Sequence, residues 1–416
     1  MKKLMICGAG GVGSAVVDLA ASRGFAPEIV VADLDTARAE RAVTRTQQRN
    51  PNSRSKLSAI ELDASSAARV ETICRELRIT HLLNAVDPRA VMPIFEGCLR
   101  AGVTYQDMAL SLSVPHPSEP YSLIGEATGA EQFAQAQTWE DKGLLALVGM
   151  GADPGLSDVF ARYASDELFD TVHTVSVRDG SNVKVTGHEF APLFSPWTVI
   201  DECLKPPVIY EKGRGWFTTE PFSEPELFDF PEGIGPVECV NVEHEEVFLV
   251  PRALDVSRVD FKYGLGEEFI NVLRVLSKLG LDAVEPIEVG GAKVSPRDVV
   301  VSLLPDPLEL ADAMRGQVCV GTLVNGQGKD GKFKEFYLYN VVDAEWSRRE
   351  FGAQPVVWQT AVSAVVGLEL LMEGTWAGSG VLCPEQLSPK PYLDLLTNGY
   401  GVAWGQQERR AVDQAA

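Results

Sequence analysis

Cysteine pairs, clustered histidines and long apolar runs are all absent from this 416-residue sequence. Its seven cysteines are scattered singly, without a CxxC pair, which argues against a zinc knuckle and against a disulfide framework. The five histidines are dispersed and no HExxH motif occurs, so we predict no metal site. No run of eighteen apolar residues is present, so we predict no membrane-spanning helix and no membrane partner. The apolar stretch after Met1 is too short for a signal peptide, which predicts a cytoplasmic protein.

Basic residues are also scarce. Lysine and arginine together number 37 against 58 acidic residues, and the formal net charge is −21. A surface that binds nucleic acid needs an excess of cations, so we exclude nucleic acid as a partner. With 45% hydrophobic and 23% charged residues the composition is that of a globular protein, and the length predicts more than one domain.

Short apolar runs alternate with amphipathic segments in the first quarter of the chain. The expected strands cover 3–7, 28–35, 59–63, 80–86 and 103–108, and the expected helices cover 14–24, 37–48, 65–77 and 92–101. Each helical segment shows apolar residues at helical spacing, and most end at a glycine or at a turn. This rhythm predicts an α/β fold built on a Rossmann-type, doubly wound parallel sheet.

The pattern changes after about residue 130. We expect helices at 157–164, 261–279, 296–304 and 357–372, a loop at 281–294, and a frayed polar tail at 406–416. Residues 318–342 alternate around a Gly-Lys-Asp-Gly turn and predict a β-hairpin. Such a block suits a mixed sheet in a second α/β domain.

A glycine cluster lies between the first apolar strand and the first helix. The residues of this loop are Gly8, Ala9, Gly10, Gly11, Val12 and Gly13, in the pattern GxGxxG. The first glycine allows a tight turn, the second lets the backbone approach a pyrophosphate, and the third lets helix and strand pack closely. The N-terminus of the following helix offers free N–H groups to phosphate. The loop therefore predicts binding of a dinucleotide.

Asp33 ends the second strand, twenty residues after Gly13. A carboxylate at this position accepts hydrogen bonds from the adenosine ribose and repels a 2′-phosphate. We therefore predict NAD as the cofactor, with NADP possible because Arg38 in the next helix could offset Asp33. The simplest interpretation of Arg38, Arg41, Arg45 and Arg49 is a solvated helix face.

Polar residues follow the later strands of the same predicted sheet. Asp63 ends the third strand, and Asn84, Ala85, Val86 and Asp87 follow the fourth. Ligands in open α/β sheets bind at the carboxyl ends of the strands, so we assign these residues to cofactor binding. Asp107 ends the fifth strand and is a candidate catalytic residue on the substrate side.

Two segments of the second half also carry candidate chemistry. A Gly-Ala-Asp-Pro-Gly turn at 151–155 joins a strand to a helix, and Asp153 in it is a candidate catalytic residue, with Gly151 and Gly155 in contact with substrate. His244 stands among acids at 243–246 and is the third catalytic candidate. Between Arg214 and Arg252 there are nine acids and no Lys or Arg, a bias that favours an amine-bearing substrate if the surface is not simply solvated.

Stretches along nearly the whole chain resemble the saccharopine dehydrogenase family in its bacterial, two-domain form. They are GAGGVG at 8–13, LLNAVDP at 82–88, CLRAGVTYQD at 98–107, GADPGLSDVFARYA at 151–164, HEEV at 244–247, LLPDP at 303–307, GTLVNGQGKDGK at 321–332 and the segment 355–387. One departure is Asp33-Leu34-Asp35, where NADP-using relatives have Ser-Arg-Thr.

The resemblance implies a domain organisation. It implies a dinucleotide-binding domain at 1–130, a substrate and dimerisation domain at 131–354, and a C-terminal segment at 355–416 that returns to the first domain and completes its sheet. It also implies a homodimer. The expected activity is an NAD(P)-dependent, reversible reduction of an imine, formed from an amine or amino acid and a carbonyl compound, to a secondary amine.

The identity of the substrate stays open at this point. A saccharopine-like substrate with three carboxylates needs arginine anchors, for which Arg178, Arg214 and Arg252 are candidates, with Asp179 beside them. A carboxynorspermidine-type dehydrogenase, which joins a diamine to an aspartate semialdehyde, is the second possibility, and a lysine 6-dehydrogenase is the third. A dinucleotide-sensing protein without turnover is the non-enzymatic alternative.

Overall fold

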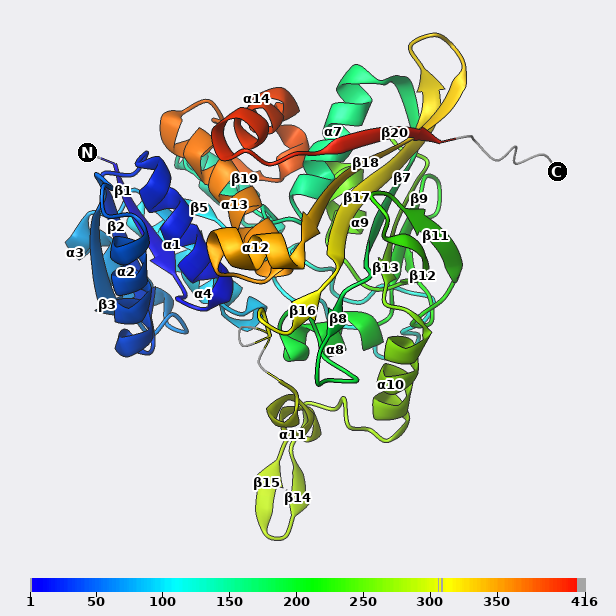
Figure 1. Cartoon of the computed structure of the whole chain (residues 1–416), viewed down its shortest axis with the longest axis horizontal. Helices are drawn as coiled ribbons and strands as arrows, with labels where there is room; N and C mark the ends of the chain where they lie inside the picture. Colours follow the sequence, from blue (N-terminus) through cyan, green and yellow to red (C-terminus); the bar gives the residue numbers. More distant parts are fainter. Residues whose placement is uncertain (1, 306, 308–309, 410–416) are drawn as a thin grey trace, which may run out of the picture.

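The chain folds around two β-sheets in two lobes, with a long helix between them (Figure 1). The structure is a computed structural model that describes residues 2–305, 307 and 310–409. Within the family-like stretch at 303–307, Asp306 therefore lies outside the described residues.

The first sheet has seven strands, all parallel, in the order β19-β6-β5-β4-β1-β2-β3. The strands are β1 (Lys3–Cys7), β2 (Glu28–Asp33), β3 (Lys56–Glu61), β4 (His81–Asn84), β5 (Thr104–Gln106), β6 (Leu145–Leu147) and β19 (Gly380–Leu382). The order reverses at β1, as it does in doubly wound sheets. This confirms the predicted Rossmann-type sheet and its completion by the C-terminal segment.

Helices cover both faces of this sheet because its strands are apolar on both sides. Alternate residues of β1 face opposite cores: Leu4 and Ile6 pack toward α1, whereas Met5 and Cys7 pack toward α3 and α4. The helices of this lobe are α1 (Gly11–Arg23), α2 (Thr36–Arg49), α3 (Ala67–Leu77), the short η1 (Pro88–Ala90), α4 (Val91–Ala101), α5 (Ala130–Ala134) and α6 (Ala136–Asp141).

Helix α13 (Pro355–Glu373) lies between the lobes, where it packs against α1 and also contacts β17 and β18 of the second sheet. Within the described part of the chain, α13 is the one helix that is long and apolar enough to cross a membrane. The sequence analysis, which looked for an unbroken run of eighteen apolar residues, did not predict such a helix. However, 89% of the most apolar window of α13 is buried inside the protein, as in a core helix.

The second sheet has nine strands and is mixed, as predicted. Its main path is β10-β9-β13-β7-β17-β18-β20, with β12 and β11 continuing from β13, and only β7 and β13 pair in parallel. The strands are β7 (Phe169–Ser181), β9 (Val208–Glu211), β10 (Gly215–Thr218), β11 (Glu226–Phe230), β12 (Gly235–Asn241), β13 (Arg258–Gly264), β17 (Gln317–Gly328), β18 (Phe333–Asp343) and β20 (Gly405–Arg409). The expected fraying of the tail is wrong for 406–409, because β20 pairs with β18; the remaining tail residues lie outside the described part.

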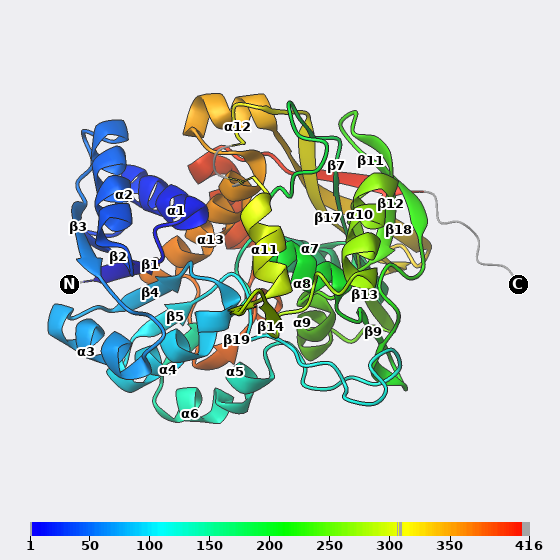
Figure 2. The same ribbon diagram turned by 90° about the horizontal axis from the view of Figure 1, so that it is seen from below.

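Helices α7 (Leu156–Glu167) and α9 (Glu246–Ala253) pack on the side of the second sheet that faces the first lobe, and Figure 2 shows them there with α8 (Pro196–Leu204). The remaining helices are α10 (Glu267–Lys278), α11 (Pro296–Leu303), α12 (Ala344–Phe351) and α14 (Pro389–Asp394), with the 3-10 helix η2 (Pro384–Gln386) before α14 and the π-helix η3 (Leu395–Gly399) after it. Two short pairs complete the lobe: β8 (Lys184–Val185) with β16 (Met314–Arg315), and β14 (Ile287–Val289) with β15 (Ala292–Val294).

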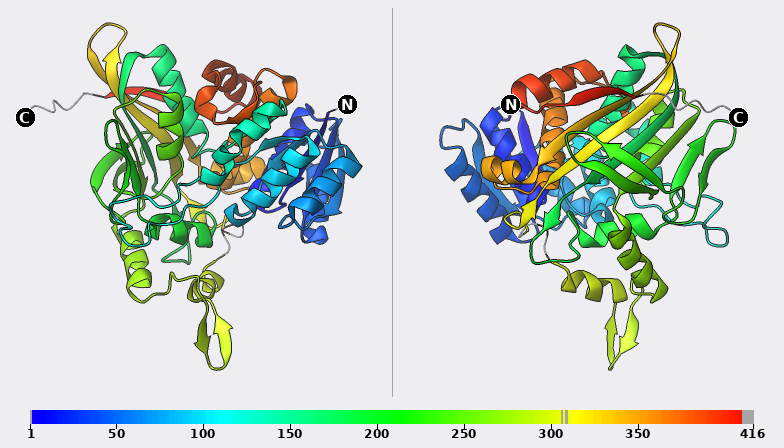
Figure 3. Two further views of the ribbon diagram at one scale, coloured as in Figure 1. Left: turned by 180° about the vertical axis from the view of Figure 1, so that it is seen from behind. Right: turned by 45° about the vertical axis from the view of Figure 1, so that its right-hand side comes forward.

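Two local predictions were wrong in this lobe. The expected helix at 261–279 is a strand to Gly264 followed by α10, because Gly266 and the two acids after it begin the helix. The expected loop at 281–294 contains the β14–β15 hairpin, which turns at Gly290 and Gly291 with positive φ at both. This hairpin projects from the body of the molecule (Figure 3).

The domain boundaries at 130 and 354 stay predictions. Strand β6, at 145–147, pairs with β5 in the first sheet, so the chain leaves that sheet just before the turn at 151–155. That turn therefore stands at the junction of the two lobes.

Candidate active site

The glycine-rich loop after β1 meets the steric demands of a dinucleotide. Gly8 has a φ of +100°, which L side chains rarely adopt. A Cβ on Gly13 would lie 1.9 Å from the Gly8 carbonyl oxygen, so only glycine lets α1 approach β1 this closely. A Cβ on Gly10 meets no atom within 4 Å, which leaves open the space that a pyrophosphate needs. These residues therefore fit the dinucleotide that the sequence predicts, with the N-terminus of α1 facing its phosphates.

A cavity of about 560 Å³ opens beside this loop. Its lining includes Ala9, Gly10, Gly11 and Ser14 from the loop and α1, Arg38, Arg41 and Arg45 from α2, and Gly352, Ala353 and Gln354 before α13. Val12 lies half-buried in the first turn of α1. The interpretation of the α2 arginines as a solvated face is thus incomplete, since Arg45 also donates to the Phe351 carbonyl oxygen at 3.1 Å. The cationic wall is suited to phosphate groups.

Asp33 stands at the end of β2, against the glycine loop. Its Oδ2 accepts a hydrogen bond from the Ala9 N–H at 2.8 Å, and its Oδ1 accepts one from the Asp35 N–H at 2.9 Å. Each carboxylate oxygen can accept a second hydrogen bond, so a ribose hydroxyl can still bind there. The geometry fits the predicted NAD preference, which stays a prediction.

The residues after β4 lie at the edge of the first sheet where we expect the cofactor to bind. Asn84 is buried; its Nδ2 donates to the Tyr105 hydroxyl at 3.0 Å and its Oδ1 accepts from the Val86 N–H at 3.0 Å. The Ala85 carbonyl oxygen would lie 2.5 Å from a Cβ on Gly8. Asn84 and Ala85 therefore shape the glycine-rich loop through contacts within the protein. Their predicted contact with the cofactor stays a prediction.

Asp87 and Asp63 are half-buried and exposed, respectively, and both make local turns. Asp87 caps η1 by accepting from the Arg89 N–H at 3.1 Å, and it forms an ion pair with the Arg89 side chain at 2.7 Å. Asp63 accepts from the Ser65 N–H at 3.0 Å and from its hydroxyl at 2.6 Å. Turn chemistry accounts for these contacts, and the predicted cofactor roles are not tested by them.

Asp107 lies in a buried hydrogen-bond network and not in the wall of a cavity. It is 1% exposed; its Oδ1 accepts from the Gly149 N–H at 2.7 Å, and its Oδ2 accepts from the Tyr105 hydroxyl at 2.9 Å and from Gln132 Nε2 at 2.8 Å. Burial raises the pKa of Asp107 to about 7, although the three donors act in the opposite direction. The carboxyl joins β5 to the end of β6 and to α5, and it lines none of the described cavities.

The largest cavity, of about 650 Å³, lies in the second lobe and reaches the junction turn. Asp153 of that turn and Asp179 of β7 line it together, beside Tyr263 of β13 and Gln359 of α13. Gly151 and Gly155 stand behind Asp153, joined by a backbone bridge. A Cβ on Gly155 would lie 2.1 Å from the Gly151 carbonyl oxygen, so this turn depends on glycine. Contact of these two glycines with substrate stays a prediction.

The charged groups of this cavity are mostly acidic. Its lining contains four carboxyl groups, Asp153, Asp179, Glu189 and Glu268, one ammonium group, Lys184, and one imidazole, His188. Asp179 is 2% exposed whereas Glu189 and Glu268 are exposed at the rim. Among the described residues no arginine lines it. The arrangement places negative charge both at the buried end and at the mouth.

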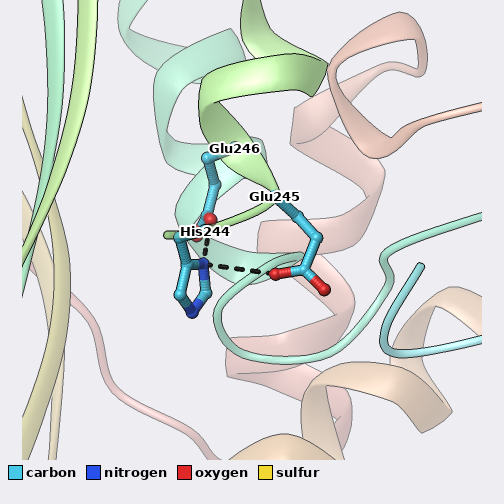
Figure 4. A group of neighbouring side chains, drawn as sticks. All are labelled: His244, Glu245 and Glu246. Carbon is cyan, nitrogen blue, oxygen red and sulfur yellow. Dashed lines mark hydrogen bonds and ion pairs between the residues drawn. The ribbon is translucent and has the colours of Figure 1, made fainter. Parts of the chain in front are cut away.

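His244 lies in a second acidic group at the start of α9 (Figure 4). Its ring stacks on Phe261 with centroids 3.7 Å apart, its Nδ1 hydrogen-bonds to Glu246, and Glu245 Oε2 lies 3.5 Å from the same nitrogen. Burial lowers the pKa of His244, but the charge of Glu246 and its hydrogen bond outweigh burial and raise it to about 10. The imidazole is therefore protonated at neutral pH and is a proton donor rather than a base.

A small cavity beside His244 reaches η1 of the first lobe. Its lining includes Pro88, Ser113, Trp197, Asp201, Glu202, Lys205, Glu243, His244 and Glu245. Burial raises the pKa of Glu243 to about 7. Lys205 Nζ forms an ion pair with Asp201 at 2.7 Å. Ligand atoms of His244, Glu245 and Glu246 lie within 4.8 Å of one another, and Nδ1 of His244 is hydrogen-bonded to Glu246.

The three candidate arginines do not converge on either cavity. Arg178 is buried, where it forms ion pairs with Glu226 and, at 2.6 Å, with Asp260. Arg214 is exposed, and its guanidinium carbon lies 3.3 Å from the centre of the Phe217 ring. The guanidinium carbon of Arg252 lies 3.9 Å from the centre of the Phe133 ring. Their predicted role as carboxylate anchors therefore finds no shared site among the described residues.

Sequence reasoning missed several residues of the site. Glu202, Glu189 and Glu268 lie in segments without a recognisable motif, and for Glu202 and Glu189 no local signal existed. For Glu268 a weak signal existed, because two acids follow a glycine at a helix start. That signal does not tell which of Glu267 and Glu268 faces the cavity.

Comparison with known families covers nearly the whole chain. Residues 4–147 match the family described as "Saccharopine dehydrogenase NADP binding domain", and residues 151–402 match "Saccharopine dehydrogenase C-terminal domain". The chain belongs to the saccharopine dehydrogenase family. The division between the two matches falls at the junction turn that carries Asp153. Membership makes the chain an NAD(P)-dependent oxidoreductase that interconverts an imine and a secondary amine, as the motifs predicted.

Curated relatives and solved structures agree with this assignment. The chain is 30% identical over 405 residues to carboxynorspermidine synthase of Vibrio cholerae, covering 96% of each protein. It is 30% identical to carboxyaminopropylagmatine dehydrogenase of Synechocystis, covering 97% of each. Saccharopine dehydrogenase (L-Glu forming) of Saccharomyces cerevisiae shares the fold, with a TM-score of 0.70, 14% identity and coverage of 98% and 100%. Homospermidine synthase of Legionella pneumophila, solved with NAD, has a TM-score of 0.63, 13% identity and coverage of 100% and 93%.

Proposed function

We propose that this enzyme joins a primary amine of a diamine, or of a guanidino-substituted amine, to an amino-acid aldehyde such as aspartate semialdehyde by reducing the imine between them. The observation that carries the proposal is the charge of the largest cavity, in which four carboxyl groups face one lysine. Cationic ligands are stabilised by such a field, and anionic ligands are repelled by it. Carboxynorspermidine synthase and carboxyaminopropylagmatine dehydrogenase, the relatives by name, support the same class of substrate.

A saccharopine-like substrate, which the sequence favoured first, is less well supported. Its three carboxylates need several guanidinium groups in the cleft, because arginine binds carboxylate through two parallel hydrogen bonds. Arg178 is already paired with Glu226 and Asp260, and Arg214 and Arg252 line neither cavity. Lys184 at the rim remains to pair with the single carboxylate of an amino-acid aldehyde.

The walls of the cavity also suit an extended amine. Phe190 and Phe269 stack at its side with centroids 4.4 Å apart, and Phe194 meets Tyr263 edge to face at 6.4 Å. Aromatic faces pack against methylene groups and attract ammonium groups. A chain with an amine at each end would then lie between the buried acids, Asp153 and Asp179, and the acids at the rim.

The residues present also meet the demands of the chemistry. A bound nicotinamide supplies the hydride. The protein has to hold the amine and the aldehyde together, remove water from the imine, and move one proton. The carboxyls of Asp153 and Asp179 line the large cavity, and the imidazole of His244 lines the small cavity that reaches η1, so these are titratable groups available to move that proton.

The substrate class is tested by following NADH and NADPH oxidation with pairs of amines and carbonyl compounds. We expect turnover with aspartate semialdehyde and 1,3-diaminopropane, putrescine or agmatine. We expect little with lysine and 2-oxoglutarate, or with glutamate and aminoadipate semialdehyde. A kcat/KM for either of the last two pairs that exceeds the values for the diamines and agmatine would contradict the proposal and favour a saccharopine-like substrate.

Two neighbouring glutamates of α10 give a matched pair of variants. Glu268 lines the large cavity, whereas Glu267, one residue earlier, does not. We expect Glu268→Gln to raise the KM for the diamine several-fold, since an exposed ion pair contributes about 1 kcal/mol or less. Glu267→Gln removes the same charge from the same helix and should leave that KM unchanged. Equal effects of the two changes would mean that overall charge, rather than the cavity, attracts the amine.

We also propose a homodimer in a reducing compartment such as the cytoplasm. Apolar side chains are exposed at Val275 and Leu279 on α10 and just after it, at Ile287 and Val289 on the projecting β14–β15 hairpin, and at Leu303 at the end of α11. Exposed apolar groups gathered in one region are typical of subunit contacts. All seven cysteines are free and buried, as is common in reducing compartments. Light scattering after gel filtration tests the dimer, and a monomer at micromolar concentration would contradict it.

A further inference from the structure

Two carboxyl groups meet at the buried end of the largest cavity, one from each side of the domain junction. Asp153 belongs to the turn that leaves the first sheet, and Asp179 belongs to β7 of the second. The Asp153 side chain is half-buried and reaches the cavity, whereas Asp179 is 2% exposed behind it. The pair thus lines the inner end of the cavity that we assign to the substrate.

One oxygen of Asp179 has no conventional partner. Its Oδ1 accepts a hydrogen bond from the Gly321 N–H at 2.9 Å. Its Oδ2 is buried and receives no hydrogen bond from any donor among the described residues. A buried carboxylate oxygen without a donor is costly, and a proton on that oxygen removes the cost. The carboxyl of Asp153 lines the same cavity and lies within hydrogen-bonding reach of the Asp179 side chain.

The surroundings favour one proton on this pair. Burial and, after it, the charge of Asp153 raise the pKa of Asp179, and burial raises the pKa of Asp153 as well. The other titratable groups that act on the pair or feel its charge are Glu246 and His244 at α9, Glu202 on α8, Tyr263 on β13, Cys239 on β12, Cys319 on β17 and Tyr337 on β18. Among them only His244 is a cation at neutral pH, and it is already paired with Glu246.

We propose that Asp153 and Asp179 act as one unit, in which Asp179 holds a proton. Asp153 carries a second proton from the ammonium group of the substrate to the hydroxyl group that leaves. This inference rests on the proposed function. The Asp153 carboxylate first takes a proton from the ammonium, which frees the nitrogen lone pair. The nitrogen then bonds to the aldehyde carbon, and one of its protons moves to the carbonyl oxygen.

The second half of the cycle returns the borrowed proton. The C–O bond of the carbinolamine breaks, the hydroxyl leaves with the Asp153 proton as water, and the nitrogen lone pair forms the C=N bond. The pair gains one proton and gives one back, so its charge is unchanged over the cycle. Asp153 is therefore the catalytic residue, and Asp179 is a positioning residue that shares its proton with the Asp153 carboxylate.

The test compares asparagine variants at the two positions. Asp153→Asn removes the proton carrier, and we expect kcat for the amine and aldehyde to fall about 10²-fold or more, the contribution of a general acid or base. Asp179→Asn replaces a protonated carboxyl by an amide of the same shape. We expect a smaller fall, on the order of 10-fold, with loss of the alkaline limb of the kcat profile against pH, because the shared proton is gone. Asp170→Asn, an exposed aspartate on the same strand, is the matched control and should change neither.

A second readout needs neither substrate nor cofactor. The infrared difference spectrum of the parent minus Asp179→Asn at neutral pH should contain the carbonyl band of one protonated carboxyl, because the other buried carboxyls contribute equally to both proteins. A difference spectrum without this band, or an Asp153→Asn variant whose kcat stays within about threefold, overturns the pair. If the band behaves as expected and no amine–aldehyde pair is reduced, the proton-sharing pair stands and the proposed substrate class fails.

Discussion

The most informative single change is Gly10→Val, because the structure separates its effect on the cofactor from its effect on the fold. Gly10 is the N-cap of α1, with φ −69° and ψ −164°, a conformation open to any residue. A Cβ there meets no atom within 4 Å. The added side chain therefore enters only the space beside the loop in which the pyrophosphate is expected to lie.

The magnitudes follow from these contacts. Replacing glycine at an N-cap by a residue that cannot cap costs about 1 kcal/mol or less. In a protein of this size that lowers the Tm by no more than about 4 °C. A displaced phosphate loses hydrogen bonds to the loop, each worth about 1.5–3 kcal/mol when the ligand is charged. The Kd for NADH should therefore rise at least about 10-fold, and about 100-fold if two bonds are lost.

The assay is a fluorescence titration of NADH into the apo protein, paired with thermal melting of the same sample. Gly13→Val is the contrasting variant, because its Cβ would lie 1.9 Å from the Gly8 carbonyl oxygen. It should lose about 3 kcal/mol or more of stability and melt well below the parent. A Gly10→Val protein that binds NADH as tightly as the parent would refute the reasoning, and so would equal melting temperatures for the two variants.

Three further predictions concern cofactor choice, structural charge and pH. The parent should show a higher kcat/KM with NADH than with NADPH, and Asp33→Ser with Leu34→Arg should reverse that ratio; a parent that prefers NADPH would contradict the role of Asp33. Arg178→Met should cost about 3–5 kcal/mol, measured by urea unfolding, because it leaves buried acids unpaired, whereas exposed Arg214→Met should stay within about 0.5 kcal/mol. Burial and the charge of Glu246 raise the folded-state pKa of Glu385 above its unfolded value, although a hydrogen bond with Asp158 acts in the opposite direction, so stability falls as pH rises from about 4 through the folded pKa. Glu385→Gln should therefore raise the Tm at about pH 9 and not at about pH 4.

The first sheet could be predicted from the sequence because its signals are local. Each βαβ unit carries its own apolar strand, its helical spacing and its glycine stop, and the structure confirms these elements to within a few residues. The strand at 258–264 was missed for a physical reason. Its inward-facing Asp260 and Lys262 are buried by ion pairs with Arg178 and Glu226, which come from other strands. Polar residues that are satisfied by distant partners hide the apolar alternation of a strand.

The candidate site was predictable in its residue types and only partly in its arrangement. Asp153 and Asp179 were both chosen because they end or follow apolar runs, and the structure places them in one cavity. Arg178, the neighbour of Asp179, points to the opposite face of the strand, since successive side chains alternate. Its partners Glu226 and Asp260 are 48 and 82 residues away in the chain, a pairing that no local pattern specifies.

The acidic side chains beside the large cavity and near His244 bear on the charge of the ligand that binds there. Burial raises the pKa of Asp153, Asp179 and Glu202. The charges of neighbouring acids raise these pKa values further, whereas the charge of His244 lowers the pKa of Asp153 and of Glu202. Carboxylates removed from water need protons, donors or cations, and those present offset only part of this charge. A bound ammonium supplies the missing cation, so the amine should bind the folded state and not the unfolded one. By mass action a diamine at about 100 times its Kd then adds about 2.7 kcal/mol of stability, whereas a dicarboxylate of equal size should add none.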